Sequence, residues 1–383
     1  MTGVEKMKSR ERVLAALKHN EPDRIPLDLG SRSSTLEAIP YNDLKKYLGF
    51  ESETVTFVKD HAEPDEEILQ QFSIDTRYVR IKRPKNFSVE MAPDNSYIDE
   101  WGTKYVKPET SLYYDAVPPY PLENASINDL EKYRWPDPND PGRVEGLEEK
   151  ARQLYQNTDY AIVADTPFLG PLEFSWLLLR GPKFLEDLII NKPFARALLE
   201  KIVDIHIQIY DNYLSTVGKY IQIVAVSDDL GAQDQPLMSP ALYREMVKPV
   251  HERLWGFIKK KTDAYLFLHS CGSICAFIPD WIELGVDIIN PVQVSAKDMD
   301  SRKLKREFGA DITFWGGIDT HRVMPMGLPD EVEEEVIRRI KDFAPGGGYV
   351  LAAAHNIQAD VNPENVCRMY ASAKKFGSYP VKL

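Results

Sequence analysis

The chain has 383 residues, of which 43% are apolar and 28% are charged, proportions typical of a globular protein with a large buried core. Its net charge of −12 argues against binding to nucleic acid or to an anionic membrane surface, since both need a basic protein surface. Three cysteines are too few for a disulfide framework. Because no apolar run resembles a signal peptide or reaches the length of a membrane span, we expect a cytoplasmic protein.

The first predicted element in chain order is a short helix over residues 9–19, with Val13, Leu14 and Leu17 on one face. Eight segments rich in Val, Ile and Leu, typical of strands buried on both faces, follow at residues 25–29, 76–81, 160–164, 221–227, 264–268, 286–291, 312–316 and 349–353. Helical patterns separate the later segments, over residues 194–217, 239–261, 301–308 and 330–343. Eight strands alternating with helices predict an α/β fold, a (β/α)8 TIM-type barrel, with an open sheet as the alternative.

Residues 83–143 interrupt this rhythm. They are rich in Pro, Asn, Asp and Tyr and have too few apolar residues to form a core of their own. We interpret them as an insertion after the second strand, in which residues 97–105 and 112–116 form a small antiparallel extension. Residues 1–383 are then predicted to form one barrel domain that carries this insertion.

Side chains that can bind or react lie at or just beyond the carboxyl ends of five predicted strands. They are Asp228, Asp229, His269, Cys271, Asn290, Gln293, Trp315, Asp319 and His355. The carboxyl ends of barrel strands meet at one mouth, where barrel enzymes place their active sites. We therefore expect these residues to gather in one site.

Three of these residues form a candidate metal site. His269 and Cys271 are two positions apart at a strand end, so their side chains point to the same side. His355 offers a third ligand from another strand. A mixed set of nitrogen and sulfur ligands with an open position is typical of catalytic zinc. The alternative is a hydrogen-bonded histidine beside an inert buried thiol.

The acidic candidates have several possible roles. Asp228 and Asp229 could be metal ligands, a proton-transfer pair or substrate contacts, or a helix cap with a solvated neighbour. Adjacent residues on a strand end point apart, so we expect these two to differ in role. Glu173 follows the third strand and is a candidate catalytic acid, or else an ordinary acid at a helix N-terminus.

The candidate substrate-binding residues are polar groups at strand ends and two aromatic rings. The polar residues are Asn290, Gln293 and Asp319. Phe168 and Trp315 could line an apolar pocket, although aromatic side chains at such positions also belong to cores.

At this point the sequence resembles the uroporphyrinogen decarboxylase superfamily over nearly its whole length. The motifs that carry the resemblance are RERVLAAL at 10–17, EPDRIP at 21–26, DDLG at 228–231, WGGID at 315–319, HNIQ at 355–358 and NPEN at 362–365. The resemblance implies a distorted TIM barrel.

Two branches of the superfamily are distinguished by their motifs. True decarboxylases use no metal and carry an arginine-rich N-terminal motif, of which only Arg32 remains here within residues 29–34. The other branch comprises zinc-dependent methyltransferases that work with corrinoid proteins, with a His-x-Cys motif and a later cysteine as hallmarks. His269 and Cys271 match the first hallmark, and His355 stands in place of the later cysteine. The resemblance therefore implies zinc as cofactor and a corrinoid carried by a partner protein.

An imidazole in place of a thiolate leaves a metal with less negative charge and makes it a stronger Lewis acid, which favours release of an alkoxide or phenolate. We therefore predict methyl transfer from a small methoxylated substrate, such as an aromatic one, to a corrinoid protein. Asp228, Asp229 or Glu173 would complete the metal shell or handle the proton. Methylation of a thiol such as coenzyme M, metal-free decarboxylation of a porphyrinogen and ligand binding without catalysis stay open as alternatives. The family includes dimers, so a homodimer is one assembly that the resemblance allows.

Overall fold

The computed structural model of the chain describes residues 6–58, 60–108 and 111–382. Its centre is a curled sheet of seven parallel strands in the order β12-β11-β10-β9-β8-β7-β3. Their bounds are β3 Thr76–Val79, β7 Ala161–Ala164, β8 Ile223–Ser227, β9 Tyr265–His269, β10 Ile288–Asn290, β11 Thr313–Ile318 and β12 Tyr349–Ala353. All seven lie within one or two residues of predicted strands, because the apolar runs that mark them are buried almost completely.

The predicted first strand, residues 25–29, closes the sheet into a barrel. Leu27 bridges Leu351 of β12 in parallel, and the backbone N–H of Asp28 donates to the carbonyl of Leu351 over 3.0 Å. On the other side, the N–H of Asp75, just before β3, donates to the carbonyl of Leu27 over 2.9 Å. The segment thus takes the place of the eighth strand between β12 and β3, which confirms the predicted TIM-type barrel.

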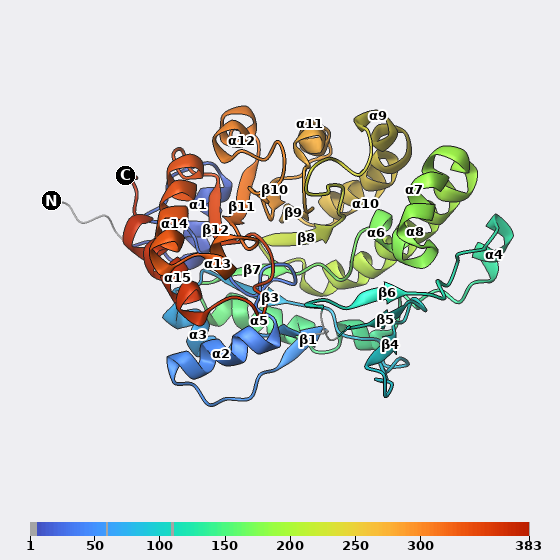
Figure 1. Cartoon of the computed structure of the whole chain (residues 1–383), viewed down its shortest axis with the longest axis horizontal. Coiled ribbons are helices and arrows are strands. Elements are labelled where there is room, and N and C mark those ends of the chain that lie inside the picture. The colour runs from blue at the N-terminus through green and yellow to red at the C-terminus, as the bar shows by residue number, and fades with distance from the viewer. Residues whose placement is uncertain (1–5, 59, 109–110, 383) are drawn as a thin grey trace.

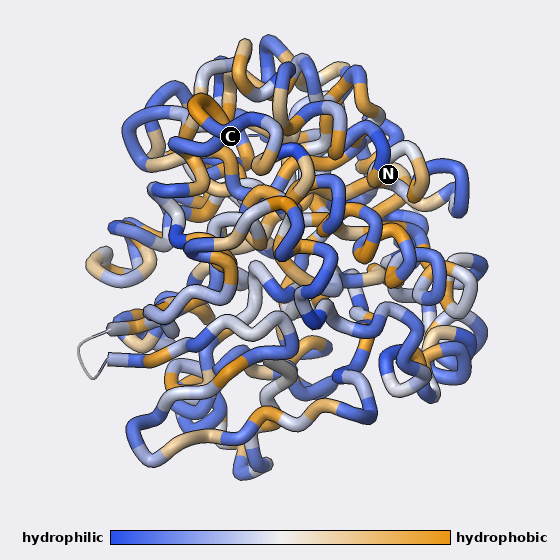
Figure 2. Tube along the Cα trace, turned by 90° about the vertical axis from the view of Figure 1, so that its right-hand side faces the viewer, coloured by the Kyte–Doolittle hydropathy of each residue, from blue (hydrophilic) through white to orange (hydrophobic). Residues whose placement is uncertain are grey.

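Helices surround the sheet on its outer side, as Figure 1 shows. The helices that follow the barrel strands in turn are α5 Leu147–Asn157, α6 Pro171–Leu179, α7 Gly181–Ile190, α8 Lys192–Val217, α9 Pro240–Leu242, α10 Lys248–Lys261, α11 Ile278–Glu283, α12 Ser301–Phe308, α13 Val323–Met326, α14 Pro329–Phe343 and α15 Pro363–Phe376. The helices nearer the N-terminus, besides α1, are α2 Ala38–Leu48, α3 Glu66–Gln71 and α4 Ile127–Lys132. Figure 2 shows hydrophobic stretches through the body of the barrel and hydrophilic stretches along the outer loops.

The barrel interior is filled by its own side chains and plugged by the first helix. Helix α1 (Ser9–Leu17) contributes Val13 and Leu17 to an interior cluster that includes Phe267, Ile288 and Trp315. Because α1 packs against β7 and β12 at the closed end, the opposite end, formed by the carboxyl ends of the strands, is left for a site.

The insertion forms a three-stranded antiparallel sheet of β4 Ser96–Ile98, β5 Lys104–Val106 and β6 Asp115–Val117. These strands lie in the segments predicted to form a small antiparallel extension, and a turn divides residues 97–105 between β4 and β5. Asp99 accepts the N–H groups of Trp101 and Thr103, and Gly102 has a φ of +82°, a value that favours glycine. A second small pair, β1 Thr56–Val58 and β2 His61–Ala62, lies near α2.

Within the described part of the chain, no helix combines the length and the apolar character needed to cross a membrane.

Candidate metal centre

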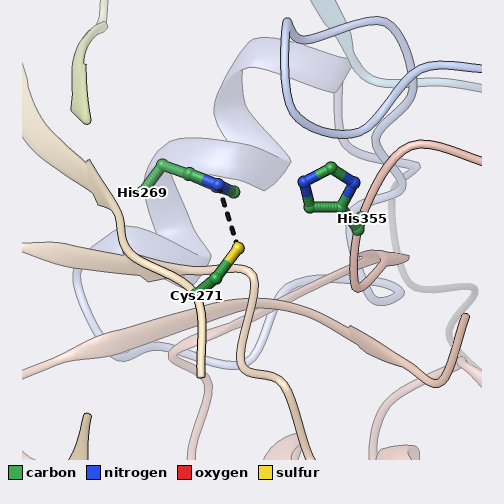
Figure 3. Close-up of side chains that lie close together, drawn as sticks. All are labelled: His269, Cys271 and His355. Atoms are coloured by element: carbon green, nitrogen blue, oxygen red, sulfur yellow. Dashed lines mark hydrogen bonds between the residues drawn. The ribbon is translucent and has the colours of Figure 1, made fainter. Parts of the chain in front are cut away.

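The three predicted metal ligands meet at the mouth of the barrel. His269 is the last residue of β9, Cys271 follows two residues later, and His355 follows the end of β12. One ligand atom from each lies within 4.8 Å of the others, and the three side chains face one another in Figure 3. His269 Nε2 and Cys271 Sγ are 3.4 Å apart. Strands far apart in the sequence thus supply one site.

Asn290 fixes which nitrogen of His269 is available to a metal. The amide nitrogen of Asn290 lies 3.1 Å from the carbonyl oxygen of Trp315, which can only accept, so the amide oxygen must face His269. That oxygen is 2.6 Å from Nδ1 of His269, which therefore carries the proton and donates. The lone pair of Nε2 is left pointing toward Cys271, as in metal sites where a second residue orients a histidine ligand.

The turn that carries Cys271 is held by neighbouring strand ends. Asp229 accepts the N–H of Cys271 over 2.7 Å, and Gln293 accepts the N–H of Gly272 over 2.9 Å. Gly272 has a φ of +83° and lies against Gly231, so that a Cβ on Gly272 would come within 2.4 Å of Gly231 backbone atoms. The DDLG motif therefore provides both a carboxylate and a glycine that position the thiol.

His355 has the protonation state that a metal requires. Burial, and then the proximity of His269, His61 and His321, lower its pKa to about 3, so its imidazole is neutral near pH 7. Among the described residues, none forms a hydrogen bond with its Nδ1. The ring is thus held by its packing, including an edge contact with Tyr113 at a ring-centroid distance of 6.4 Å.

The chemistry of these groups fits zinc. A tetrahedral ion with bonds of about 2.0–2.3 Å holds its ligands roughly 3.3–3.7 Å apart, which matches the distance between His269 Nε2 and Cys271 Sγ. Burial and the charges of Asp229 and Glu173 raise the pKa of the Cys271 thiol well above its usual 9.0. A bound cation would offset this excess of negative charge and deprotonate the thiol.

The two adjacent aspartates have separate roles, as expected from their places on the strand end. Asp229 faces the metal centre, with one carboxylate oxygen 4.0 Å from His269 Nε2. Asp228 is fully buried and accepts the N–H groups of Leu172 and Glu173, each over 3.0 Å. Asp228 therefore caps α6, and its side chain is turned away from the metal ligands.

Glu173 lies on the first turn of α6, close to the same site. Its carboxyl accepts from the Ser227 hydroxyl over 3.2 Å. Burial and the charges of Asp229 and Asp228 raise its pKa well above the usual 4.5. The structure thus provides one carboxyl group beside the site whose surroundings favour its protonated form.

A cavity of about 320 Å³ opens beside Cys271 and His355. Gln293 and Asp319, two of the predicted substrate-binding residues, line it together with Tyr113, Ser295 and His321. A larger cavity of about 620 Å³ adjoins it and shares Ser295, Asp319 and His321. Tyr113 was not predicted individually as a site residue, because its local sequence does not distinguish it from the other tyrosines of the insertion.

The other predicted substrate-binding residues line neither cavity. Asn290 is fully buried and contacts His269. Trp315 belongs to the barrel interior, with its indole N–H donating to Asp28 over 2.9 Å. Phe168 is buried and stacks on His206 at a centroid distance of 4.0 Å. These positions indicate structural packing or ligand positioning.

The fold agrees with the sequence comparisons. The family description "Uroporphyrinogen decarboxylase (URO-D)" matches residues 111–376, more than half of the chain. The chain therefore belongs to the uroporphyrinogen decarboxylase family.

Two curated relatives bear the names of different activities. Over 276 residues the chain is 25% identical to a uroporphyrinogen decarboxylase of Pseudoalteromonas translucida, a match covering 66% of this chain and 70% of the relative. Over 181 residues it is 26% identical to a methylated-thiol–coenzyme M methyltransferase of Methanosarcina mazei, covering 47% and 44%. A solved methyltransferase structure from Methanosarcina mazei superposes with a TM-score of 0.63 at 18% identity, covering 97% and 99% of the two chains, which supports the shared fold.

Proposed function

We propose that the chain is a zinc-dependent methyltransferase that moves a methyl group from a small methoxylated substrate to the cobalt of a corrinoid protein. The observation that carries the proposal is the convergence of His269, Cys271 and His355 at the barrel mouth, with Asn290 orienting His269. A metal-free decarboxylase has no use for a thiol and two neutral imidazoles aimed at one point.

His269, Cys271 and His355 would hold the zinc ion, which supplies a Lewis acid at the mouth. The cavity of about 320 Å³ next to these ligands suits a small substrate. The surroundings of Glu173 favour its protonated form, so Glu173 could donate a proton to the oxygen that the methyl group leaves. The methyl–oxygen bond breaks, the oxygen takes the proton, and the methyl group passes to cobalt(I), which is formally oxidised to cobalt(III).

A second candidate is methylation of a thiol. The 26% identity to a methylated-thiol–coenzyme M methyltransferase favours it, because the name of that relative describes a thiol acceptor. The two candidates share the metal centre and differ in the group that occupies the cavity.

The experiment uses the zinc-loaded protein with free cob(I)alamin as acceptor and a panel of methoxylated benzoates as donors. Methyl transfer is followed by the absorbance of methylcobalamin. We expect turnover with at least one donor and a loss of about 100-fold or more in Cys271→Ala. Demethylation of methylcobalamin by coenzyme M, without reaction of any methoxylated donor, would support the thiol alternative. Decarboxylation of uroporphyrinogen by the metal-free protein would overturn the proposal.

A further inference from the structure

A buried chain of hydrogen bonds leads from the outer helices to the metal centre. The indole N–H of Trp281 lies 3.1 Å from the hydroxyl oxygen of Tyr243, and that oxygen lies 3.1 Å from Nδ1 of His251. His251 Nε2 is in turn 2.8 Å from a carboxylate oxygen of Asp228. All four side chains are fully buried. Tyr243 begins a π-helical turn, Tyr243–Val247, a feature frequent at functional sites.

For a neutral His251 beside an ionised Asp228, the geometry assigns the donors and acceptors of these hydrogen bonds. The indole of Trp281 can only donate, so the oxygen of Tyr243 accepts. The single hydroxyl proton of Tyr243 is then available for Nδ1 of His251. A neutral His251 must therefore carry its proton on Nε2 and donate it to Asp228. Asp228 then accepts three N–H groups in all, from Leu172, Glu173 and His251.

Asp228 connects this series of hydrogen bonds to helix α6. Its carboxylate binds the N–H groups of Leu172 and Glu173 at the first turn of the helix. The approach is close because residue 170 is a glycine: a Cβ there would lie 2.1 Å from the Ser227 carbonyl and 2.2 Å from Asp228 Cγ. The position of Glu173 beside the metal centre therefore depends on where Asp228 is held.

Asp228 also connects this series of hydrogen bonds to the metal ligands. Its N–H donates to the carbonyl of His269 over 3.0 Å, and the next residue, Asp229, holds the N–H of Cys271. The hydroxyl of Ser270 accepts the N–H of Leu230 over 3.1 Å. The ends of β8 and β9 are thus joined on both sides of Asp228, so a shift of Asp228 would move the turn that carries the thiol.

We propose that His251 is a positioning residue for the metal centre. By donating to Asp228, it fixes the turn at residues 228–230 and, through that turn, the positions of Cys271 and Glu173. The inference rests on the proposed function, since it assumes that His269, Cys271 and His355 bind zinc. Neither the motifs nor the contacts of the ligands alone indicate it, because His251 lies on α10 and touches none of them directly.

The test compares zinc affinity, measured by competition with a chromogenic chelator, in variants of the full chain. His251→Leu removes the donor to Asp228, and we expect zinc affinity to fall by about 10-fold to 100-fold. His251→Gln places an amide N–H where Nε2 lies and should restore affinity close to that of the wild type. Tyr243→Phe releases Nδ1 of His251 and should weaken zinc binding in the same direction by a smaller factor. It provides the test if His251→Leu does not fold.

The matched control is His206→Leu. His206 lies on α8 and, like His251, is fully buried, but its imidazole forms no hydrogen bond with any described residue. It should change thermal stability without changing zinc affinity. Zinc binding by His251→Leu or by Tyr243→Phe at wild-type affinity would overturn the inference, as would failure of His251→Gln to restore binding. Absence of zinc binding by the wild type would instead overturn the proposed function, and the inference with it.

Discussion

Asn290 is a neutral residue whose two ends act on different partners. Its amide nitrogen is committed to the Trp315 carbonyl and its oxygen to His269 Nδ1. The sequence indicated a substrate-binding role, because Asn290 follows a strand end and its amide can bind a ligand. The structure instead supports a role in orienting His269, which depends on a strand neighbour that only the fold identifies.

Replacing Asn290 with leucine is expected to lower zinc affinity by about 10-fold to 100-fold, because His269 loses the acceptor that keeps the proton on Nδ1. Chelator competition measures this change. The control is Asn365→Leu, a buried asparagine whose amide donates to the Met324 and Gly327 carbonyls. It should lower stability and leave zinc affinity unchanged. Equal zinc affinity in Asn290→Leu and the wild type would show that Asn290 does not orient the ligand.

Glu173 gives the metal-free protein a predictable dependence on pH. Its pKa in the folded chain is raised above the usual 4.5, so the folded state holds a proton that the unfolded state releases. Its contribution to stability is therefore full below about pH 4.5 and is lost as pH rises toward the folded pKa, by about 1.4 kcal/mol for each unit by which the pKa is raised.

Glu173→Gln removes this titration while keeping an acceptor for Ser227. Thermal unfolding of the metal-free variant and wild type at pH 5 and pH 8 should show the variant gaining stability relative to the wild type at the higher pH. Parallel behaviour of the two proteins at both pH values would contradict the raised pKa.

The placement of helix α6 depends on the absence of a side chain at Gly170. Gly170 has an ordinary extended backbone that alanine can also adopt, so only the close contact with Ser227 and Asp228 requires glycine there. The helix depends on this contact for its N-terminal cap, since Asp228 supplies the acceptor that local residues do not.

Gly170→Ala is expected to displace the first turn of α6, lowering both the free energy of unfolding and zinc affinity. The matched control is Gly256→Ala in the middle of α10, where an added Cβ meets nothing within 4 Å. That control should stabilise the chain by about 1 kcal/mol, because alanine favours the helix more than glycine does. Denaturant unfolding measures the stability of both variants, and chelator competition measures their zinc affinity. A Gly170→Ala variant as stable as the wild type would show that the contact can relax.

Most elements could be predicted from the sequence because their signals are local. Apolar runs mark the strands, and residues 301–308 match the bounds of α12. The antiparallel extension was predicted without the turn at Asp99, because that turn lies within an otherwise strand-like segment. Of the site, His269 and Cys271 could be paired by spacing alone, and His355 by the expectation that strand ends meet. The contacts of Asp228 with α6 and of His251 with Asp228 depend on packing between distant segments and have no local signal.

At the scale of the whole molecule, the barrel separates stability from function. Helix α1 plugs one end, and the other end combines the metal centre with a residue from the insertion. Tyr113 lines the cavity and contacts the ring of His355. The insertion is therefore placed to influence which substrate enters, although it contributes no metal ligand among the residues described.

Tyr113→Ala should raise the KM for the methyl donor by about 3-fold to 10-fold, the loss expected from one aromatic contact, while kcat and zinc content stay close to those of the wild type. Steady-state kinetics with a reactive methoxylated benzoate and metal analysis test this together. A fall in zinc content would indicate that Tyr113 supports His355 instead of the substrate.

Metal analysis of the purified full chain, by inductively coupled plasma mass spectrometry after reconstitution with zinc, decides whether the barrel mouth is a metal centre. We predict about one zinc per chain in the wild type and in His321→Ala, which alters the cavity but no ligand. The variants His269→Ala, Cys271→Ala and His355→Ala should each lose most of this zinc while keeping the circular dichroism spectrum of the folded chain. A wild type without zinc, or ligand variants that retain it, would contradict the zinc-dependent mechanism.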